Sequence, residues 1–187
     1  PSNNQEFDAL FARAAERLTP LVQTVENTPS QLTPQETAKV RSCIADLKVC
    51  VNISSNHWQS MALLAKAHQS LGDHRSSMEW LAGAMKIETT NPILAKEASI
   101  AALHLREIDI ALRFSAEAIR RRPNDPALLG NHAMNLLIAR RDKQAMETIV
   151  GALAIAPDDA FNQQISKVIY QVIAGQRARP TCESALQ

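Results

Sequence analysis

The sequence has few aromatic residues and few glycines, and its acidic and basic side chains almost balance. Aromatic residues make up 4% of the 187 positions and there are 5 glycines, a composition typical of helices built on Ala and Leu. The net charge of +1 at pH 7 argues against a nucleic-acid-binding protein, which usually carries a large basic excess. No apolar run approaches the roughly 20 residues that a membrane-spanning helix needs, so we expect no membrane insertion.

Cysteine is also scarce, and its three positions do not suggest a disulfide framework. Cys43 and Cys50 fall seven residues apart on one expected helix, about 10 Å along its axis, which is too far for a disulfide. We interpret both as small buried hydrophobic residues rather than as a metal pair or a reactive thiol. An odd number of cysteines fits a reducing compartment, and no signal peptide is visible, so we expect a cytoplasmic protein. The first residue is Pro1 rather than Met, so we expect the numbering to start after a removed tag, a processed leader or upstream domains.

Motifs that carry catalysis are missing as well. The sequence contains no glycine-rich phosphate loop, no G-x-S-x-G and no paired-acid motif in a plausible setting. None of its five histidines forms the i, i+4 pair of a helical zinc site. We therefore expect a protein that is not an enzyme and that needs neither a metal nor a cofactor.

What the sequence does contain is an internal repeat of 34 residues, over residues 58–91, 92–125 and 126–159. The small alanines of this repeat lie where two helices must approach closely, and a larger side chain there would overpack. Asn91, Asp125 and Asp159 precede each expected helix as N-caps, and the prolines begin or end helices. The aligned pairs are Pro92 with Pro126, Ala111 with Ala145, Ala118 with Ala152, Pro123 with Pro157, and Asp125 with Asp159.

This pattern resembles the tetratricopeptide repeat (TPR) family, in which each repeat is a pair of antiparallel helices, A and B. The resemblance implies an all-α fold, an α-solenoid in which the helix pairs stack into a right-handed superhelix. The period and the small residues carry it, because three positions that are aromatic in the family hold other residues here. These are Met61, Ala95 and Leu129; His68, Ala102 and Leu136; and Leu81, Ser115 and Ile149.

The flanking segments extend the predicted solenoid on both sides of the three repeats, which we place within residues 56–159. Residues 1–55 predict an N-terminal helical hairpin, a divergent repeat whose first helix is kinked or broken at Pro20 and whose second helix begins after Thr33. Residues 160–175 predict a capping helix that covers the last hydrophobic face and ends at Gly175. Residues 176–187 have no periodicity and predict a loose tail that either drapes on the body or leads to another domain.

The resemblance also implies a binding surface on the concave face, which is lined by helix A of each repeat. The family's two-carboxylate clamp is not preserved, since Glu97 occupies one of its positions and would repel a carboxylate. We predict instead an apolar groove with a polar rim that binds an amphipathic helix or an apolar peptide. The protein's own first or terminal helix could equally cover this groove, as could self-association. The residues predicted to line it are Lys66, Lys96, Ile100, Leu103, His104, Asn131, Met134, Leu137 and Ile138.

Arginine clusters at two places one repeat apart, Arg120 to Arg122 and then Arg140 and Arg141. The first run closes a helix, where cations complement the negative end of the helix dipole, and the second falls in a turn between helices. We therefore interpret both runs as structural rather than as a patch for phosphate or an acidic partner.

The leading hypothesis for function is a non-enzymatic scaffold or adaptor that binds a peptide or a helix of a partner protein. Two alternatives remain open at this point. The chain could be an accessory TPR region of a larger multidomain enzyme, or it could form a purely architectural homodimer.

Overall fold

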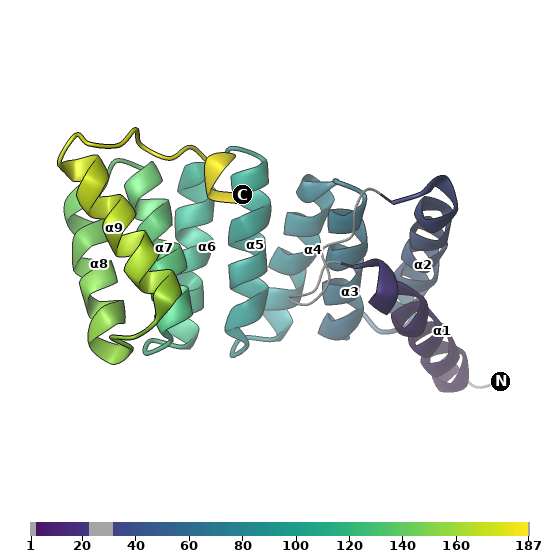
Figure 1. Cartoon of the computed structure of the whole chain (residues 1–187). Coiled ribbons are helices and arrows are strands. Elements are labelled where there is room, and N and C mark those ends of the chain that lie inside the picture. The colour runs from purple at the N-terminus through teal and green to yellow at the C-terminus, as the bar shows by residue number, and fades with distance from the viewer. Residues whose placement is uncertain (1–2, 23–31, 187) are drawn as a thin grey trace. The chain divides into compact units, whose positions relative to one another are not determined.

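The computed structural model describes residues 3–22 and 32–186, and within them it is all-α, with no strand. None of these helices is both long enough and apolar enough to cross a membrane. Figure 1 shows the helices in chain order. They are α1 (Asn3–Leu18), α2 (Pro34–Ile53), α3 (Trp58–Ser70), α4 (His74–Ile87), α5 (Pro92–His104), α6 (Ile108–Arg121), α7 (Pro126–Ile138), α8 (Asp142–Ile155) and α9 (Ala160–Ile173), with short 3-10 turns η1 (Thr19–Leu21) and η2 (Ser184–Leu186).

The chain divides into an N-terminal unit, residues 1–89, and a C-terminal unit, residues 90–187. In the N-terminal unit each helix packs on the next, from α1 to α4. Helix α2 begins with the predicted capping box, in which the Thr33 side chain accepts from the Glu36 backbone N–H and the Glu36 carboxylate accepts from the Thr33 N–H at 2.8 Å. Cys43 and Cys50 are both fully buried on α2, so they are core residues of this unit.

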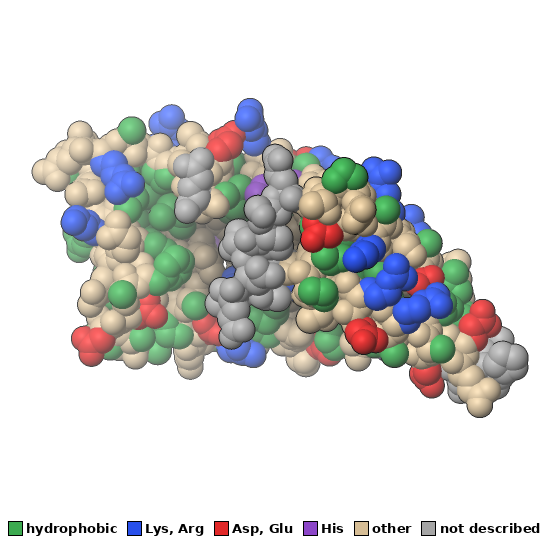
Figure 2. Space-filling view, turned by 45° about the vertical axis from the view of Figure 1, so that its right-hand side comes forward, with side chains coloured by type: hydrophobic (Ala, Val, Ile, Leu, Met, Phe, Trp, Pro, Cys, Tyr) green, Lys and Arg blue, Asp and Glu red, His purple; other side chains and the backbone are tan. Residues whose placement is uncertain are grey.

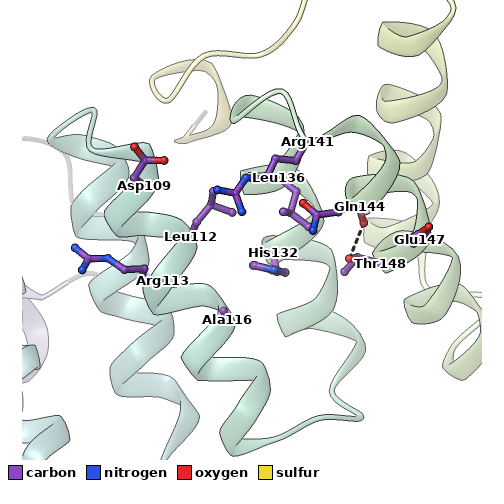
Figure 3. A pocket seen from close by; sticks show the side chains of 10 residues that line it. All are labelled: Asp109, Leu112, Arg113, Ala116, His132, Leu136, Arg141, Gln144, Glu147 and Thr148. Carbon is purple, nitrogen blue, oxygen red and sulfur yellow. Dashed lines mark hydrogen bonds between the residues drawn. The ribbon is translucent and has the colours of Figure 1, made fainter.

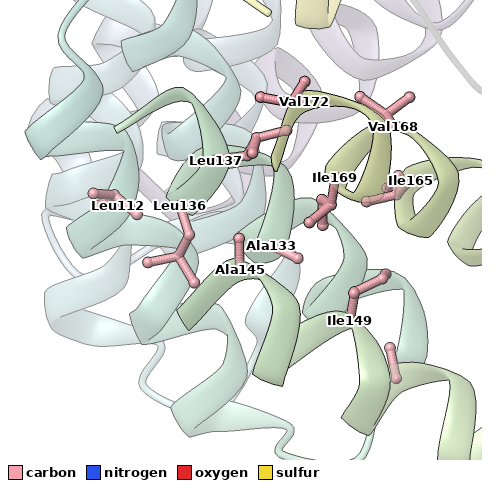
Figure 4. Packing of buried hydrophobic residues seen from close by; sticks show 11 residues of the cluster. Leu112, Ala133, Leu136, Leu137, Ala145, Ile149, Ile165, Val168, Ile169 and Val172 are labelled. Atoms are coloured by element: carbon pink, nitrogen blue, oxygen red, sulfur yellow. The ribbon is translucent and has the colours of Figure 1, made fainter. Parts of the chain in front are cut away.

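The C-terminal unit contains two antiparallel pairs, α5 with α6 and α7 with α8, followed by α9, which packs on both α7 and α8. The predicted N-caps are present, since the side chains of Asn91, Asp125 and Asp159 each accept a hydrogen bond from the first turn of the helix that follows. Figure 4 shows the core that α7, α8 and α9 share. Ile149, Leu137 and Ile169 are completely buried in it.

The turns between the helices of a pair repeat the same backbone conformation at the 34-residue period. Gly72, Arg106 and Arg140 stand 34 positions apart and have φ angles of 74°, 60° and 61°. In each turn the N–H of the next residue bonds the carbonyl five positions earlier, for example Arg141 to Leu136 at 2.9 Å. In this left-handed region the Cβ atom of arginine causes a steric cost of about 1–2 kcal/mol, which glycine avoids because it has no Cβ.

The first arginine run stabilises the end of α6. Arg121 has a side chain only 3% exposed, and it donates to the Glu117 carboxylate and to the Asn91 carbonyl. Arg120 also donates to Glu117, and Arg122 pairs with Asp125 at 3.3 Å. The hydrogen bonds that Glu117 accepts, first from Arg120 and then from Arg121, lower the pKa of Glu117 to about 2. The structural interpretation of this run therefore agrees with the contacts that its side chains make.

Residues 176–186, which we call the C-terminal strap, lie against the C-terminal unit. Figure 1 shows the chain passing from the end of α9 across the helix ends to α5. The Arg179 guanidinium donates to Asp142 at 2.8 Å and to the Leu137 carbonyl at 2.6 Å. Further along, Cys182 is buried, Glu183 pairs with Arg106, and η2 packs on α5. The strap thus contacts the first helix of this unit as well as the turn between α7 and α8.

Candidate functional site

The residues predicted to line the concave groove lie on helices α3, α5 and α7. Lys66 is on α3 of the N-terminal unit, where it is half-buried. The other eight belong to the C-terminal unit. They are Lys96, Ile100, Leu103 and His104 on α5, and Asn131, Met134, Leu137 and Ile138 on α7.

Two of these residues do not lie on an open surface. Leu137 is fully buried, and Leu103 is only 7% exposed. Figure 4 shows why Leu137 is buried, because Val172 and Ile169 of α9 belong to the same hydrophobic cluster and cover its side chain. The prediction that Leu103 and Leu137 are available to a partner is therefore wrong, and both are core residues in this structure.

The six remaining residues of the C-terminal unit are accessible, and we call them the helix-A strip. His104 is exposed, and the other five, Lys96, Ile100, Asn131, Met134 and Ile138, are half-buried. The two helices that carry the strip are joined directly, because the Asn135 amide donates to the Ser99 hydroxyl at 3.0 Å across a buried contact. Figure 2 shows hydrophobic side chains near the middle of the C-terminal part in that view, with Lys and Arg toward its upper edge.

A second accessible feature lies elsewhere on the C-terminal unit, where the surface is hollowed between α6 and α8 over α7. This α6–α8 hollow has a volume of about 620 Å³. His132 and Leu136 of α7 lie at positions about 150° around the helix from Asn131, Met134 and Ile138, so the hollow and the strip use opposite sides of α7. Figure 3 shows the side chains that line it: Asp109, Leu112, Arg113, Ala116, His132, Leu136, Arg141, Gln144, Glu147 and Thr148.

The chemistry of the hollow centres on a pair of polar side chains. The hydroxyl oxygen of Ser115, which is 3% exposed, lies 3.1 Å from the Leu112 carbonyl and 2.7 Å from His132 Nδ1. Its one proton is donated to the carbonyl or to Nδ1, according to the tautomer of the imidazole. Burial, and after it the charge of Arg141, lowers the pKa of His132. These surroundings favour the neutral form of the imidazole.

This serine–histidine pair does not form a catalytic dyad, because the Ser115 hydroxyl is buried and out of reach of a substrate. No group of three His, Cys, Asp or Glu side chains that could hold a metal ion occurs within residues 3–22 and 32–186. The hollow and the helix-A strip both present polar and apolar side chains at the surface.

Sequence reasoning did not identify the hollow. One signal was present, since Ser115 occupies a position where the neighbouring repeats hold Leu81 and Ile149. Its partner His132 lies 17 residues later on another helix, and only the packing of α6 on α7 brings the two together.

Comparison with known proteins supports the fold. No protein-family model matches the chain, and no curated protein sequence matches it. The structure is similar to the crystal structure of the MamA protein, with a TM-score of 0.74 and 13% identity over 92% of this chain and 85% of that one. It is also similar to YrrB, described as a TPR protein with an unusual peptide-binding site, with a TM-score of 0.63 and 13% identity over 76% of this chain and 73% of that one.

A third similar structure is an O-GlcNAc transferase of Thermobaculum terrenum, with a TM-score of 0.57 and 11% identity. That match covers 82% of this chain but only 27% of the transferase. At such identities the likeness establishes the fold alone. The chain has the fold of the tetratricopeptide repeat, as the 34-residue period predicts.

Proposed function

From this tetratricopeptide repeat fold, we propose that the protein is a non-enzymatic scaffold or adaptor that holds a segment of a partner protein on the helix-A strip. The observation that carries the proposal is the row of accessible apolar side chains, Ile100, Met134 and Ile138, on two helices joined by a buried hydrogen bond. The similarity to YrrB, a TPR protein with an unusual peptide-binding site, supports a ligand of this kind.

The strip suits a partner with both apolar anchors and hydrogen-bond acceptors. Ile100, Met134 and Ile138 would take the apolar side chains of an amphipathic helix or an extended peptide. Lys96, like His104 and Asn131 on the rim, would donate to carbonyls of the partner backbone. Glu97 is half-buried next to Lys96 and disfavours a carboxylate there. In the N-terminal unit, Lys66 remains a predicted additional contact.

The test is capture of partners from the source cells with three forms of the protein. The strip variant is Ile100→Glu with Ile138→Glu, and the matched control is Val150→Glu with Ile155→Glu, two exposed apolar side chains of α8 outside the strip. We expect a protein that is retained by the wild type and the control but lost from the strip variant. The helical circular dichroism and the Tm of all three forms are measured first, because Ile100 and Ile138 are half-buried whereas Val150 and Ile155 are exposed, and capture is compared only between folded forms. Identical sets of captured proteins from the strip variant and the control would refute this use of the strip.

The similarity to part of an O-GlcNAc transferase favours one alternative, an accessory region of a larger enzyme. The gene sequence on both sides of this segment tests it, since a catalytic domain encoded there would establish it. The other alternative, an architectural homodimer, predicts a doubled mass in light scattering that does not depend on concentration. If the homodimer uses the strip, Ile100→Glu with Ile138→Glu should return it to the monomer mass.

A further inference from the structure

The α6–α8 hollow has the features of a second binding site, independent of the helix-A strip. We propose that it binds a carboxylate group, which accepts hydrogen bonds from Arg141, Gln144 and His132. The carboxylate could belong to an Asp or Glu side chain of a peptide, to a peptide C-terminus or to a small free acid, and the experiment below distinguishes these sources.

The first argument is that the repeat departs from its own pattern at this place. Ser115 replaces the Leu81 and Ile149 of the neighbouring repeats, and His132 stands where α3 has Leu64. Ser115 is buried and His132 is half-buried, so polar groups stand here where Leu81, Ile149 and Leu64 are apolar. The pair satisfies Ser115 and Nδ1 of His132 but leaves Nε2 without a protein partner in the described part of the chain. Ala116 is small and leaves room for a ligand in front of the imidazole.

The second argument is the charge inside the hollow. Figure 3 shows Arg141 reaching from the α7–α8 turn toward α6, over Leu112, on the same side as His132. No carboxylate of the described residues pairs with Arg141. Asp142, the next residue, is held by Arg179, and Glu147 lies 3.9 Å from Lys143.

The other charged groups around the imidazole lie at the margins of the hollow. Figure 3 shows Asp109 at the far end of the α6 side, Arg113 directed away from His132, and Glu147 directed away on the α8 side. The centre therefore offers the Arg141 guanidinium and the Gln144 side-chain amide as donors, above an apolar floor. Donors of this kind, one of them charged, match a carboxylate better than any neutral acceptor.

Donation from His132 to the carboxylate requires a proton on Nε2, because the oxygen and an unprotonated nitrogen would repel one another, and the imidazolium carries a proton on each ring nitrogen. The ligand supplies the negative charge that offsets Arg141, and the pKa of the imidazole rises in the complex. Between the pKa of the free protein and that of the complex, one proton is taken up for each ligand bound. The dissociation constant should then fall about tenfold for each unit by which the pH is lowered, and level off on both sides of this interval.

The experiment is a titration of the intact 15N-labelled protein, followed by the ring nitrogen resonances of His132. The probes are Ac-Ala-Glu-Ala-NH2 for a side-chain carboxylate, Ac-Ala-Ala-Ala with a free C-terminus, sodium glutarate for a small acid, and Ac-Ala-Gln-Ala-NH2 as the uncharged control. We expect a saturable change toward the doubly protonated imidazole with at least one carboxylate probe and none with the glutamine peptide. The probe that binds most tightly identifies the source of the carboxylate.

Two neighbouring arginines provide the matched variants. Arg141 lines the hollow, whereas Arg140 lies in the same turn and does not line it. Arg141→Gln should weaken binding at least about tenfold, and Arg140→Gln should change it less than about twofold. Ser115→Ala removes the hydroxyl that orients the imidazole and should alter how the dissociation constant of the carboxylate probe depends on pH. Ile138→Glu on the helix-A strip should leave binding unchanged.

Three results would overturn the proposal. The first is the absence of a saturable change at His132 with any carboxylate probe up to its solubility limit. The second is equal binding of the glutamate and glutamine peptides. The third is an equal loss of affinity in Arg140→Gln and Arg141→Gln, which would indicate general attraction to positive charge. A failure of the strip variants to lose a partner would bear only on the proposed function.

Discussion

Replacing Gly130 with alanine should test how closely α9 approaches α7. Gly130 is buried in the middle of α7, where a Cβ atom would lie 2.0 Å from Asn162 Oδ1 and 3.2 Å from a ring carbon of Phe161. Asn162 is itself fully buried and donates its amide to the Pro126 carbonyl at 3.0 Å. The asparagine therefore cannot remain in place beside an alanine.

The size of the effect follows from three contributions. Alanine is the better helix former by about 1 kcal/mol, which favours the variant. Overpacking a close helix contact costs about 1–3 kcal/mol. Turning Asn162 away breaks its bond to Pro126 and leaves buried polar groups unsatisfied, at about another 1–3 kcal/mol. We expect Gly130→Ala to lower the free energy of unfolding by about 1–5 kcal/mol in urea titrations followed by circular dichroism.

The matched control is Gly151→Ala on α8, where a Cβ would have no heavy atom of the described residues within 4 Å. This variant should gain about 0.5–1 kcal/mol from helix propensity alone. A double-mutant cycle with Asn162→Ala adds a second test, because removing the obstructing amide should recover part of the loss caused by Gly130→Ala. If Gly130→Ala stabilises the protein as Gly151→Ala does, or if the cycle shows no coupling, then Asn162 of α9 does not lie as close to Gly130 of α7 as the structure indicates.

Three further predictions concern other contacts of the C-terminal unit. Leu137→Ala should cost about 2–5 kcal/mol in the free energy of unfolding, since the side chain is fully buried, and an effect below about 1 kcal/mol would contradict its place in the core. Arg179→Gln removes the ion pair with Asp142 and should make residues 176–186 more sensitive to limited proteolysis, whereas Arg177→Gln at an exposed position of the strap should not. The pKa of Glu117 is lowered from 4.5 to about 2, so its contribution to stability is complete above pH 4.5 and is lost as the pH falls toward 2. Glu117→Gln should accordingly lower the free energy of unfolding by about 1–2 kcal/mol at pH 7 and by almost nothing at pH 2, and an equal loss at both pH values would show that this ion-pair cluster is not its cause.

The helices could be predicted from the sequence because their signals are local. Asp125 and Pro126 lie next to one another, and the Asp125 side chain caps a helix that begins only one residue later. The same holds for Thr33 and Glu36, which are three residues apart. The hydrophobic spacing within each helix then determines which side is buried, over a distance of one or two turns.

The exposure of residues on the candidate binding surfaces was predicted less well, because exposure depends on segments that are distant in sequence. The pattern around Leu137 places it correctly on helix A, but whether that position is open depends on α9, which packs there from residues 165–172. The tail has no periodicity, so the sequence predicted a loose segment that either drapes on the body or leads to another domain, and did not say what would hold it. Its attachment rests on Arg179, whose partner Asp142 lies 37 residues earlier in the chain.

By itself, the sequence determined the all-α repeat fold, since the period of 34 residues, the helix caps and the small residues are all visible within short stretches of the chain. Only the tertiary structure decided which positions remain accessible. Burial of Leu103 and Leu137, the pairing of Ser115 with His132, and the course of the strap all depend on contacts between different helices. Such contacts follow from how the helices pack, and packing is a property of the whole unit rather than of any one stretch of it.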